Sequence, residues 1–313
     1  MPHPRRSIAA LAVALAATLL AACGGGGGSA AGAGGGPVVV ATTTQVADFA
    51  RAVAGRRADV RQILTPNSDP HAYEPRPSDV RAVAGAKLVV RSGGDLDDWL
   101  AGVLRNAGSD ARTVELIKAV HARRGEGAID PHWWQDPRNA EIGVGRIRDA
   151  LIAADPGGRA AYSANAAAYL RRLHRLDDAI AACMGRIPAS KRRLVTDHDA
   201  LGYYADRYGI EVIGTVIPAL STQAQASAGE VARLVRTIRR AGVTTIFPES
   251  STSAKLERAI ARDAGARVGP PLYADSLGPA GSPGATYLGS LRANTRALVA
   301  GFTGGATRCD LPA

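Results

Sequence analysis

The feature that most constrains the fold is a long amphipathic segment between two stretches of mixed strand-like and helix-like sequence. Its apolar residues recur at three- and four-residue steps between residues 158 and 184: Tyr162, Ala166, Tyr169, Leu170, Leu173, Leu176, Ile180 and Cys183. This spacing predicts one helix of about 40 Å, at 1.5 Å per residue. Such a helix exceeds the usual length and can link two lobes rather than belong to one.

On both sides of this segment, short β-branched runs alternate with amphipathic stretches. Before it, strands are expected at residues 38–41, 60–64, 88–91 and 113–116, and helices at 44–54, 77–84, 95–107 and 138–154. After Pro188, strands are expected at 193–196, 211–217, 244–247 and 266–269, and helices at 199–208, 227–241, 252–264 and 288–302. The alternation predicts βα units with mostly parallel sheets. The expected fold class is therefore α/β, with two βα lobes joined by one long backbone helix.

The expected domain organisation follows from this pattern. We place an N-terminal lobe at residues 37–154, the linking backbone helix at 155–187 and a C-terminal lobe at 188–313. The chain has 313 residues, of which 46% are apolar, so it can bury one or two cores.

The N-terminus carries the marks of an export signal. Arg5 and Arg6 precede an apolar run from Ile8 to Ala22, which is too short for a stable membrane span. The run Leu20-Ala21-Ala22-Cys23 resembles a bacterial lipobox, which implies a lipoprotein signal peptide at residues 1–22 and an acylated Cys23. An ordinary secretory signal and a twin-arginine signal are the alternatives. Residues 24–36 are mostly Gly, Ala and Ser, so segment 23–36 is expected to be a flexible tether of roughly 20 Å.

Three histidines stand in loop contexts. His71 lies in SDPHAYEPRPSD, where the prolines exclude a helix interior or a central strand. His132 lies in DPHWWQDP and His198 in TDHD. The first loop follows a predicted strand, and open α/β proteins bind ligands at the carboxyl ends of strands. One histidine beside a proline is usually a polar surface residue, so only the three histidines together indicate a binding site.

With Asp275 in LYADSLGP, these motifs resemble the cluster A-I (TroA-like) metal-binding lipoproteins, the solute-binding components of zinc and manganese ABC importers. DPHAYEPRPSD, DPHWWQDP and DHDALGYYADRYGIEVIG occur in the family's order and at about its separations. The resemblance implies that His71, His132, His198 and Asp275 bind the metal. It also implies an ABC permease in the cytoplasmic membrane as partner, and a monomer lipid-anchored on the extracytoplasmic face of the cell membrane.

The donor types favour zinc as the transported ion. Neutral imidazoles with one carboxylate suit four-coordinate Zn²⁺, and four protein donors leave no open position for a reactive water. The chain is therefore expected to carry metal and not to be an enzyme. Asp275 has the alternative role of capping a turn or helix. Glu249 is a candidate acceptor for a ligating imidazole, with Asp136, Asp197 and Asp199 as alternatives, and Trp133 and Trp134 either wall the cleft or belong to the core.

Manganese remains the alternative cargo. The resemblance implies histidine at the third ligand position in zinc carriers and glutamate in many manganese carriers, and this sequence has His198. Many zinc carriers also have a long His- and acid-rich loop between the first two ligands, but residues 120–129 are short and contain only His121 and Glu126. A metal-dependent hydrolase and a surface adhesin are more distant alternatives.

The cysteines and the net charge bear on the compartment and the partners of the protein. If Cys23 is acylated, Cys183 and Cys309 remain in an oxidising compartment, which favours a disulfide between them, with a buried Cys183 on the apolar helix face as the alternative. The formal net charge of +10 could indicate nucleic acid. The arginines are scattered over predicted helix faces, however, so a solvated surface without a nucleic-acid partner is expected.

Overall fold

The structure is a computed structural model that describes residues 36–125 and 127–313. The predicted signal peptide, Cys23 and almost all of the tether lie outside these residues.

The first half of the described chain builds a four-stranded parallel sheet. The strands are β1 (Val38–Ala41), β2 (Asp59–Gln62), β3 (Leu88–Arg91) and β4 (Arg112–Glu115), in the order β2-β1-β3-β4. Val39 of β1 faces one core together with helix α1 (Thr44–Ala54), while Val40 faces a second core together with α2 (Pro77–Ala84) and α3 (Leu100–Ala107). A sheet covered on both faces needs continuous apolar strands, which explains the run Val38-Val39-Val40.

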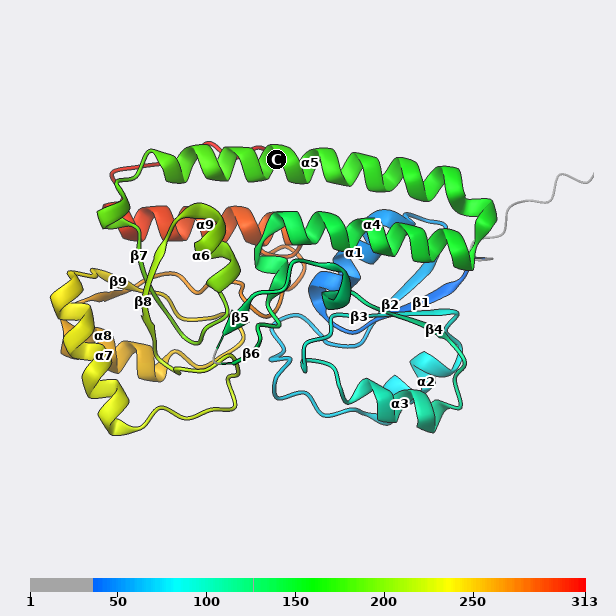
Figure 1. Cartoon of the computed structure of the whole chain (residues 1–313), viewed down its shortest axis with the longest axis horizontal. Helices are drawn as coiled ribbons and strands as arrows, with labels where there is room; N and C mark the ends of the chain where they lie inside the picture. The colour runs from blue at the N-terminus through cyan, green and yellow to red at the C-terminus, as the bar shows by residue number, and fades with distance from the viewer. Residues whose placement is uncertain (1–35, 126) are drawn as a thin grey trace, which may run out of the picture. The chain divides into compact units, whose positions relative to one another are not determined.

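Helix α5 (Arg159–Gly185) is the long helix that the apolar spacing predicts. It packs along α4 (Pro137–Ala154) from the first half and against α9 (Tyr287–Thr303) from the second half (Figure 1). All of the predicted stripe is buried except the partly buried Leu170. Proline at the first position of α4 and the Asp136 side chain, which accepts the Arg138 N–H, fix where α4 begins. The helix α5 thus contacts both halves of the chain.

The second half repeats the βα pattern, and two of its four strands, β9 and β10, have only two residues each. Its elements are β7 (Arg193–Thr196), α6 (Gly202–Tyr208), β8 (Glu211–Thr215), α7 (Ala228–Ala241), β9 (Thr245–Ile246), α8 (Lys255–Ala264) and β10 (Arg267–Val268). The pairs β7–β8 and β9–β10 are parallel, and a parallel bridge from Thr196 to Phe247 connects them. The predicted α/β class, with two βα lobes, mostly parallel sheets and one long helix, is confirmed. The boundaries at residues 154 and 187 stay predictions.

Three helices begin later than predicted. The helix expected from residue 95 begins at Leu100, because the buried Asp97 carboxylate accepts the N–H groups of Ser92 and Gly93 and bends the chain around itself. The helices expected from residues 199 and 252 begin at Gly202 and Lys255. Ahead of α6, the backbone N–H of Asp199 donates to the carbonyl of Ala219, which lies on another loop.

Several short elements have no counterpart in the sequence-based prediction. They are the antiparallel pair β5 (Arg124–Gly125) and β6 (Ala128–Ile129), and the 3₁₀ turns Ile117–Ala119, Trp133–Gln135, Pro156–Gly158 and Ala189–Lys191. Elements of two or three residues carry too little periodicity to be read from sequence.

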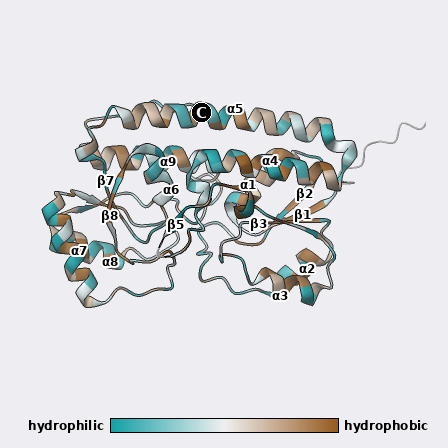
Figure 2. Ribbon diagram, viewed as in Figure 1, coloured by the Kyte–Doolittle hydropathy of each residue, from teal (hydrophilic) through white to brown (hydrophobic). Residues whose placement is uncertain are grey.

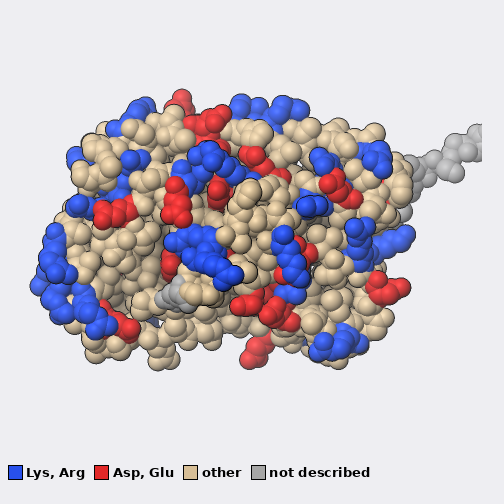
Figure 3. Space-filling model, in the orientation of Figure 1, with Lys and Arg blue, Asp and Glu red and all other residues tan. Residues whose placement is uncertain are grey.

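The surface of the described chain is mixed in character. Hydrophobic and hydrophilic residues alternate along the helices (Figure 2), and none of the described helices is long and apolar enough to cross a membrane. Basic and acidic side chains are interspersed over the face in view, with a denser basic group along α7 at the left (Figure 3). Helix α7 contains Arg233, Arg236, Arg239 and Arg240.

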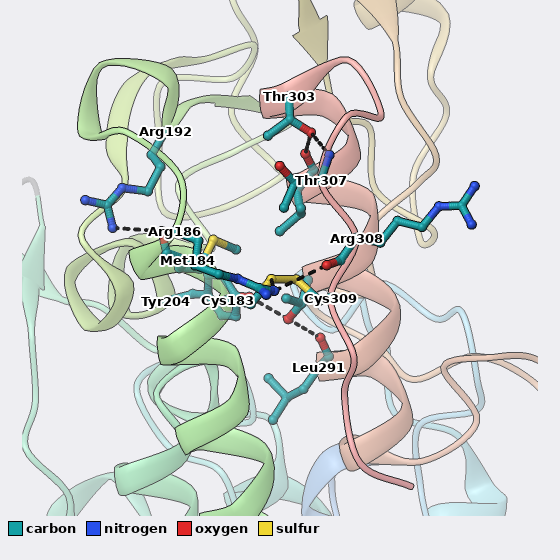
Figure 4. The surroundings of a disulfide bond; sticks show 12 residues. Cys183, Met184, Arg186, Arg192, Tyr204, Leu291, Thr303, Thr307, Arg308 and Cys309 are labelled. Carbon is teal, nitrogen blue, oxygen red and sulfur yellow. Dashed lines mark hydrogen bonds between the residues drawn. A yellow bond between two sulfur atoms is a disulfide. The ribbon is translucent and has the colours of Figure 1, made fainter.

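A disulfide ties the C-terminal segment to the end of α5. Cys183, which is 2% exposed, is bonded to Cys309, with 5.7 Å between their Cα atoms (Figure 4). Arg186 reaches across the same junction and donates to the carbonyl of Arg308. The bridge closes 126 positions of chain.

Candidate metal centre

The four residues singled out in the sequence come together at one point. His71 Nε2 lies 3.4 Å from His132 Nε2, which lies 3.3 Å from His198 Nε2. Asp275 Oδ2 is 3.3 Å from His71 Nε2 and 3.4 Å from His198 Nε2, and Asp275 Oδ1 is 3.3 Å from His132 Nε2. Residues up to 204 positions apart thus direct four potential ligand groups at one centre.

These separations match the size of a zinc site. Atoms at the corners of a tetrahedron are separated by about 1.63 times their distance from its centre, so edges of 3.3–3.4 Å correspond to bonds of about 2.0–2.1 Å. Zn–N and Zn–O bonds have these lengths. Both oxygens of Asp275 face the imidazoles, so the carboxylate can bind through one oxygen or two.

The repeated Asp-Pro-His sequence has a structural cause. The Asp69 side chain accepts the backbone N–H of His71 at 2.9 Å, and the Asp130 side chain accepts that of His132 at 3.0 Å. Each aspartate therefore closes a local turn two residues before a histidine, and the proline between them holds its own φ fixed. The same three-residue device presents both imidazoles of the first half.

Two buried carboxylates orient the imidazoles. His132 Nδ1 lies 2.8 Å from Asp130 Oδ1, and His198 Nδ1 lies 2.6 Å from Glu249 Oε1. An Nδ1–H donated to a carboxylate leaves the Nε2 lone pair free for a metal. Asp130 is held in turn by Arg123 at 3.0 Å. Asp130 is not among the acceptors expected from the sequence, although it stands two residues before His132, as Asp69 stands before His71.

The other acceptor candidates have other partners, although Asp197 lies near His198 and Glu249. Asp136 caps α4, Asp197 accepts the Thr252 hydroxyl, and Asp199 lies 3.9 Å from Arg123. His174 pairs with Glu141 on an exposed part of α5, away from the four residues. Glu249 is the one among the four candidates that contacts an imidazole of the centre.

The loop of Asp275 is held mainly by the first half of the chain. The carbonyl of Ala274 accepts bonds from the Trp134 indole at 3.0 Å and the Gln135 amide at 2.8 Å. The Leu277 N–H donates to the Thr44 hydroxyl at 2.8 Å. Trp133 and Trp134 are 0% and 2% exposed, so both belong to the core, and Trp134 also fixes the residue next to Asp275.

Burial and charge set the protonation of the centre. Burial lowers the pKa of His132, but the charges of Asp275 and Asp130 outweigh it and raise the pKa to about 10. Burial also lowers the pKa of His198, but the charges of Glu249 and Asp275 outweigh it and raise this pKa to about 9. Burial raises the pKa of Asp275, but His198 and His132 hold it well below its usual range. Negative charge in the centre therefore attracts cations, whether protons or a metal.

The four residues of the centre differ in exposure to solvent. The side chains of His132, His198 and Asp275 are fully buried, while that of His71 is 8% exposed. His71 lies on the loop between β2 and α2. His71 is therefore the ligand nearest to solvent.

The fold and the centre together define a class: a two-lobed, metal-binding solute-binding protein. Comparison with known proteins agrees with it. The sequence profile of ZnuA, described as the periplasmic component A of a zinc-uptake complex, matches residues 39–301. The chain belongs to this family.

Individual relatives carry the names of different metals. The manganese-binding lipoprotein MntA of Halalkalibacterium halodurans is 31% identical over 261 residues, 82% of this chain and 86% of that protein. The iron-binding protein YfeA of Yersinia pestis is 30% identical over 263 residues, 83% of this chain and 84% of that protein. The solved structure of the periplasmic zinc-binding protein TroA from Treponema pallidum superimposes with a TM-score of 0.80 at 28% identity, covering 86% of this chain and 99% of that one.

Proposed function

We propose that this protein is the extracytoplasmic solute-binding lipoprotein of an ABC importer, which captures a zinc ion and delivers it to a membrane permease. The observation that carries the proposal is the set of imidazole and carboxylate separations, 3.3–3.4 Å, around one buried point. Three nitrogens and a carboxylate at this spacing suit four-coordinate zinc. Such a set fills the coordination shell, which favours carriage over catalysis.

The N-terminal sequence supports a membrane-tethered carrier. Acylation of Cys23 would anchor the chain, and the Gly-rich segment after it would let the folded part move near the permease. The relatives named lipoproteins are consistent with this arrangement. In this role the protein acts as a monomer with no nucleic-acid partner.

Manganese is the second candidate cargo, and two observations favour it. Relatives named for manganese and iron are among those most similar in sequence. Both oxygens of Asp275 also face the centre, which would supply an additional hard donor of the kind that manganese prefers.

Metal analysis of the protein purified from its own host without added metal tests the proposal. We expect about one zinc per chain, since one centre holds one ion. Manganese or iron at that ratio would replace zinc as the cargo while keeping the carrier role. A chain that holds none of these metals and takes none up after chelation would contradict the proposal.

A further inference from the structure

A polar cavity is lined in part by residues next to two ligands of the metal centre. Its volume is about 310 Å³, and three carboxylates line it: Asp69, Asp197 and Glu257. The hydroxyls of Thr222, Ser251 and Thr252 line it as well. None of its lining residues in the described chain is Lys or Arg. The cavity therefore gathers negative charge and oxygen atoms without a cationic side chain to balance them.

Two of the carboxylates are almost completely buried. Asp197 is 3% exposed and Glu257 is 1% exposed. Burying an ionised carboxylate is costly unless it is paired or binds a metal. The only side chain that donates to Asp197 among the described residues is that of Thr252, at 2.9 Å. Glu257 Oε2 has no hydrogen-bond partner in the described part of the chain.

The third carboxylate lies at the edge of the cavity. Asp69 Oδ2 accepts the Thr222 hydroxyl at 2.7 Å, which links the loop of His71 to the second half of the chain. Asp69 stands two residues before His71, and Asp197 directly precedes His198. The walls of the cavity are thus formed in part by the loops that present two histidines of the metal centre.

We propose that this cavity binds a second, hydrated divalent cation through oxygen ligands, with Asp197 and Glu257 as its buried carboxylates and Asp69 at its edge. Carboxylates and hydroxyls are the ligands of hard cations such as Ca²⁺, Mg²⁺ and Mn²⁺, whereas imidazoles suit zinc. The volume is sufficient for a cation with its waters, since a water occupies about 30 Å³. Burial, with the neighbouring Asp197, raises the pKa of Glu257 to about 8, as expected beside uncompensated negative charge.

A cation in this cavity would affect the ion in the metal centre. A cation that contacts Asp69 and Asp197 holds the loop of His71 against the loop of His198. Because His71 is the most exposed member of the centre, this link restrains the ligand nearest to solvent. This inference does not depend on which metal the centre carries.

Calcium titration by calorimetry on the chelator-treated protein tests the inference. Calcium is the probe because it takes oxygen ligands. We expect one calcium per chain, with a dissociation constant of about 0.1–1 mM, the range of extracellular calcium modules. Glu257→Gln should weaken calcium binding at least about tenfold, because the amide cannot supply the carboxylate that forms when calcium displaces the proton of Glu257. The matched control Glu211→Gln changes a glutamate whose side chain is 62% exposed on the same half, and it should leave calcium binding unchanged.

Two further variants separate this cavity from the metal centre. His132→Ala disables the imidazole centre and should retain calcium binding, so a loss in this variant would place calcium in that centre and overturn the inference. Asp69→Asn removes the charge at the edge of the cavity and should also weaken binding, which keeps the test available if Glu257→Gln does not fold. Failure of the wild type to bind calcium, or equal binding by Glu257→Gln, would also overturn the inference.

Discussion

At the scale of single residues, the three histidines have equivalent tasks but different support. Asp130 and Glu249 each face an Nδ1 atom, and Asp69 holds the backbone of His71. A carboxylate behind an imidazole fixes its tautomer and raises its basicity. The metal centre therefore includes the residues that hold the ligands in place as well as the ligands themselves.

The first prediction concerns the three imidazoles. Zinc at a thousandfold excess over its dissociation constant should stabilise the folded state by about 4 kcal/mol, because the site exists only when the chain is folded. His71→Ala, His132→Ala and His198→Ala should each lose most of that gain in a thermal unfolding assay. The control His121→Ala, which changes an exposed histidine outside the centre, should keep it. If all three variants keep the wild-type shift, the ligand assignment is wrong.

The second prediction concerns pH. The pKa values of His132 and His198 are raised to about 10 and about 9, so both imidazoles hold protons at neutral pH until a metal displaces them. Their stabilisation of the metal-free protein is complete below about pH 6.5 and is lost as the pH rises through the folded-state values. Zinc affinity should instead increase from about pH 6 to about 9, because fewer protons then compete with zinc for the imidazoles.

Calorimetry in buffers of different ionisation enthalpy measures this exchange directly. Zinc binding at pH 7 should release about two protons per ion, one from each raised imidazole. An enthalpy that is independent of the buffer, together with an affinity that is flat between about pH 6 and 9, would contradict this assignment of protons.

The third prediction concerns metal choice at one residue. Zinc stands above manganese in the Irving–Williams order, so three imidazoles and a carboxylate should bind zinc more tightly. His198→Glu replaces a nitrogen donor with a hard oxygen donor, so it should narrow the preference for zinc over manganese in competition titrations. If the wild type already binds both equally, or the variant has the same ratio, His198 does not set selectivity. The short loop at residues 120–129 would then count in favour of manganese.

At the scale of elements, the disulfide connects the end of α5 to the C-terminal segment that follows α9. By loop closure, a bridge across 126 positions stabilises by up to about 4 to 5 kcal/mol. Replacing both Cys183 and Cys309 by Ser should therefore lower the free energy of unfolding, measured by denaturant titration, by a few kcal/mol at most.

The same double variant should leave metal affinity intact, because neither cysteine contacts the four residues of the centre or their carboxylate partners. If the free energy of unfolding does not change, the disulfide adds nothing measurable to the packing around position 183 in the core. A large loss of zinc affinity would mean that the position of α5 controls the centre.

The sequence predicts the long elements well and the local departures poorly. The spacing of Tyr162, Tyr169, Leu173 and Ile180 predicts α5 because the stripe is set by the helix alone. The start of α3 at Leu100 depends on Asp97, which also accepts the hydroxyl of Thr42, 55 positions away. A contact of that separation leaves no periodic trace in the sequence.

At the scale of the whole molecule, the same distinction applies to the metal centre. The Asp-Pro-His loops were recognisable because their turn is local to three residues. The link from Glu249 to His198 depends on two adjacent strands of the second half, joined by the bridge from Thr196 to Phe247. The pairing of Glu249 with His198, and not with another histidine, therefore follows from strand order, which sequence spacing alone does not contain.

The two halves of the chain meet at the centre through fixed contacts. Asn67 donates to the carbonyl of Leu277, and Thr44 accepts the N–H of the same residue. With α5 packed on both α4 and α9, these contacts oppose a large opening between the halves. Ion release is then expected to depend on the loop of His71 more than on separation of the lobes.

We expect one ion to be held by three imidazole nitrogens and the carboxylate of Asp275. X-ray absorption at the zinc edge of the zinc-loaded protein measures this shell directly. We expect three nitrogen atoms at about 2.0–2.1 Å, with the multiple-scattering signal of imidazole rings, and carboxylate oxygen at about 2.0–2.2 Å. A shell of oxygen atoms alone, or one containing sulfur, would contradict it.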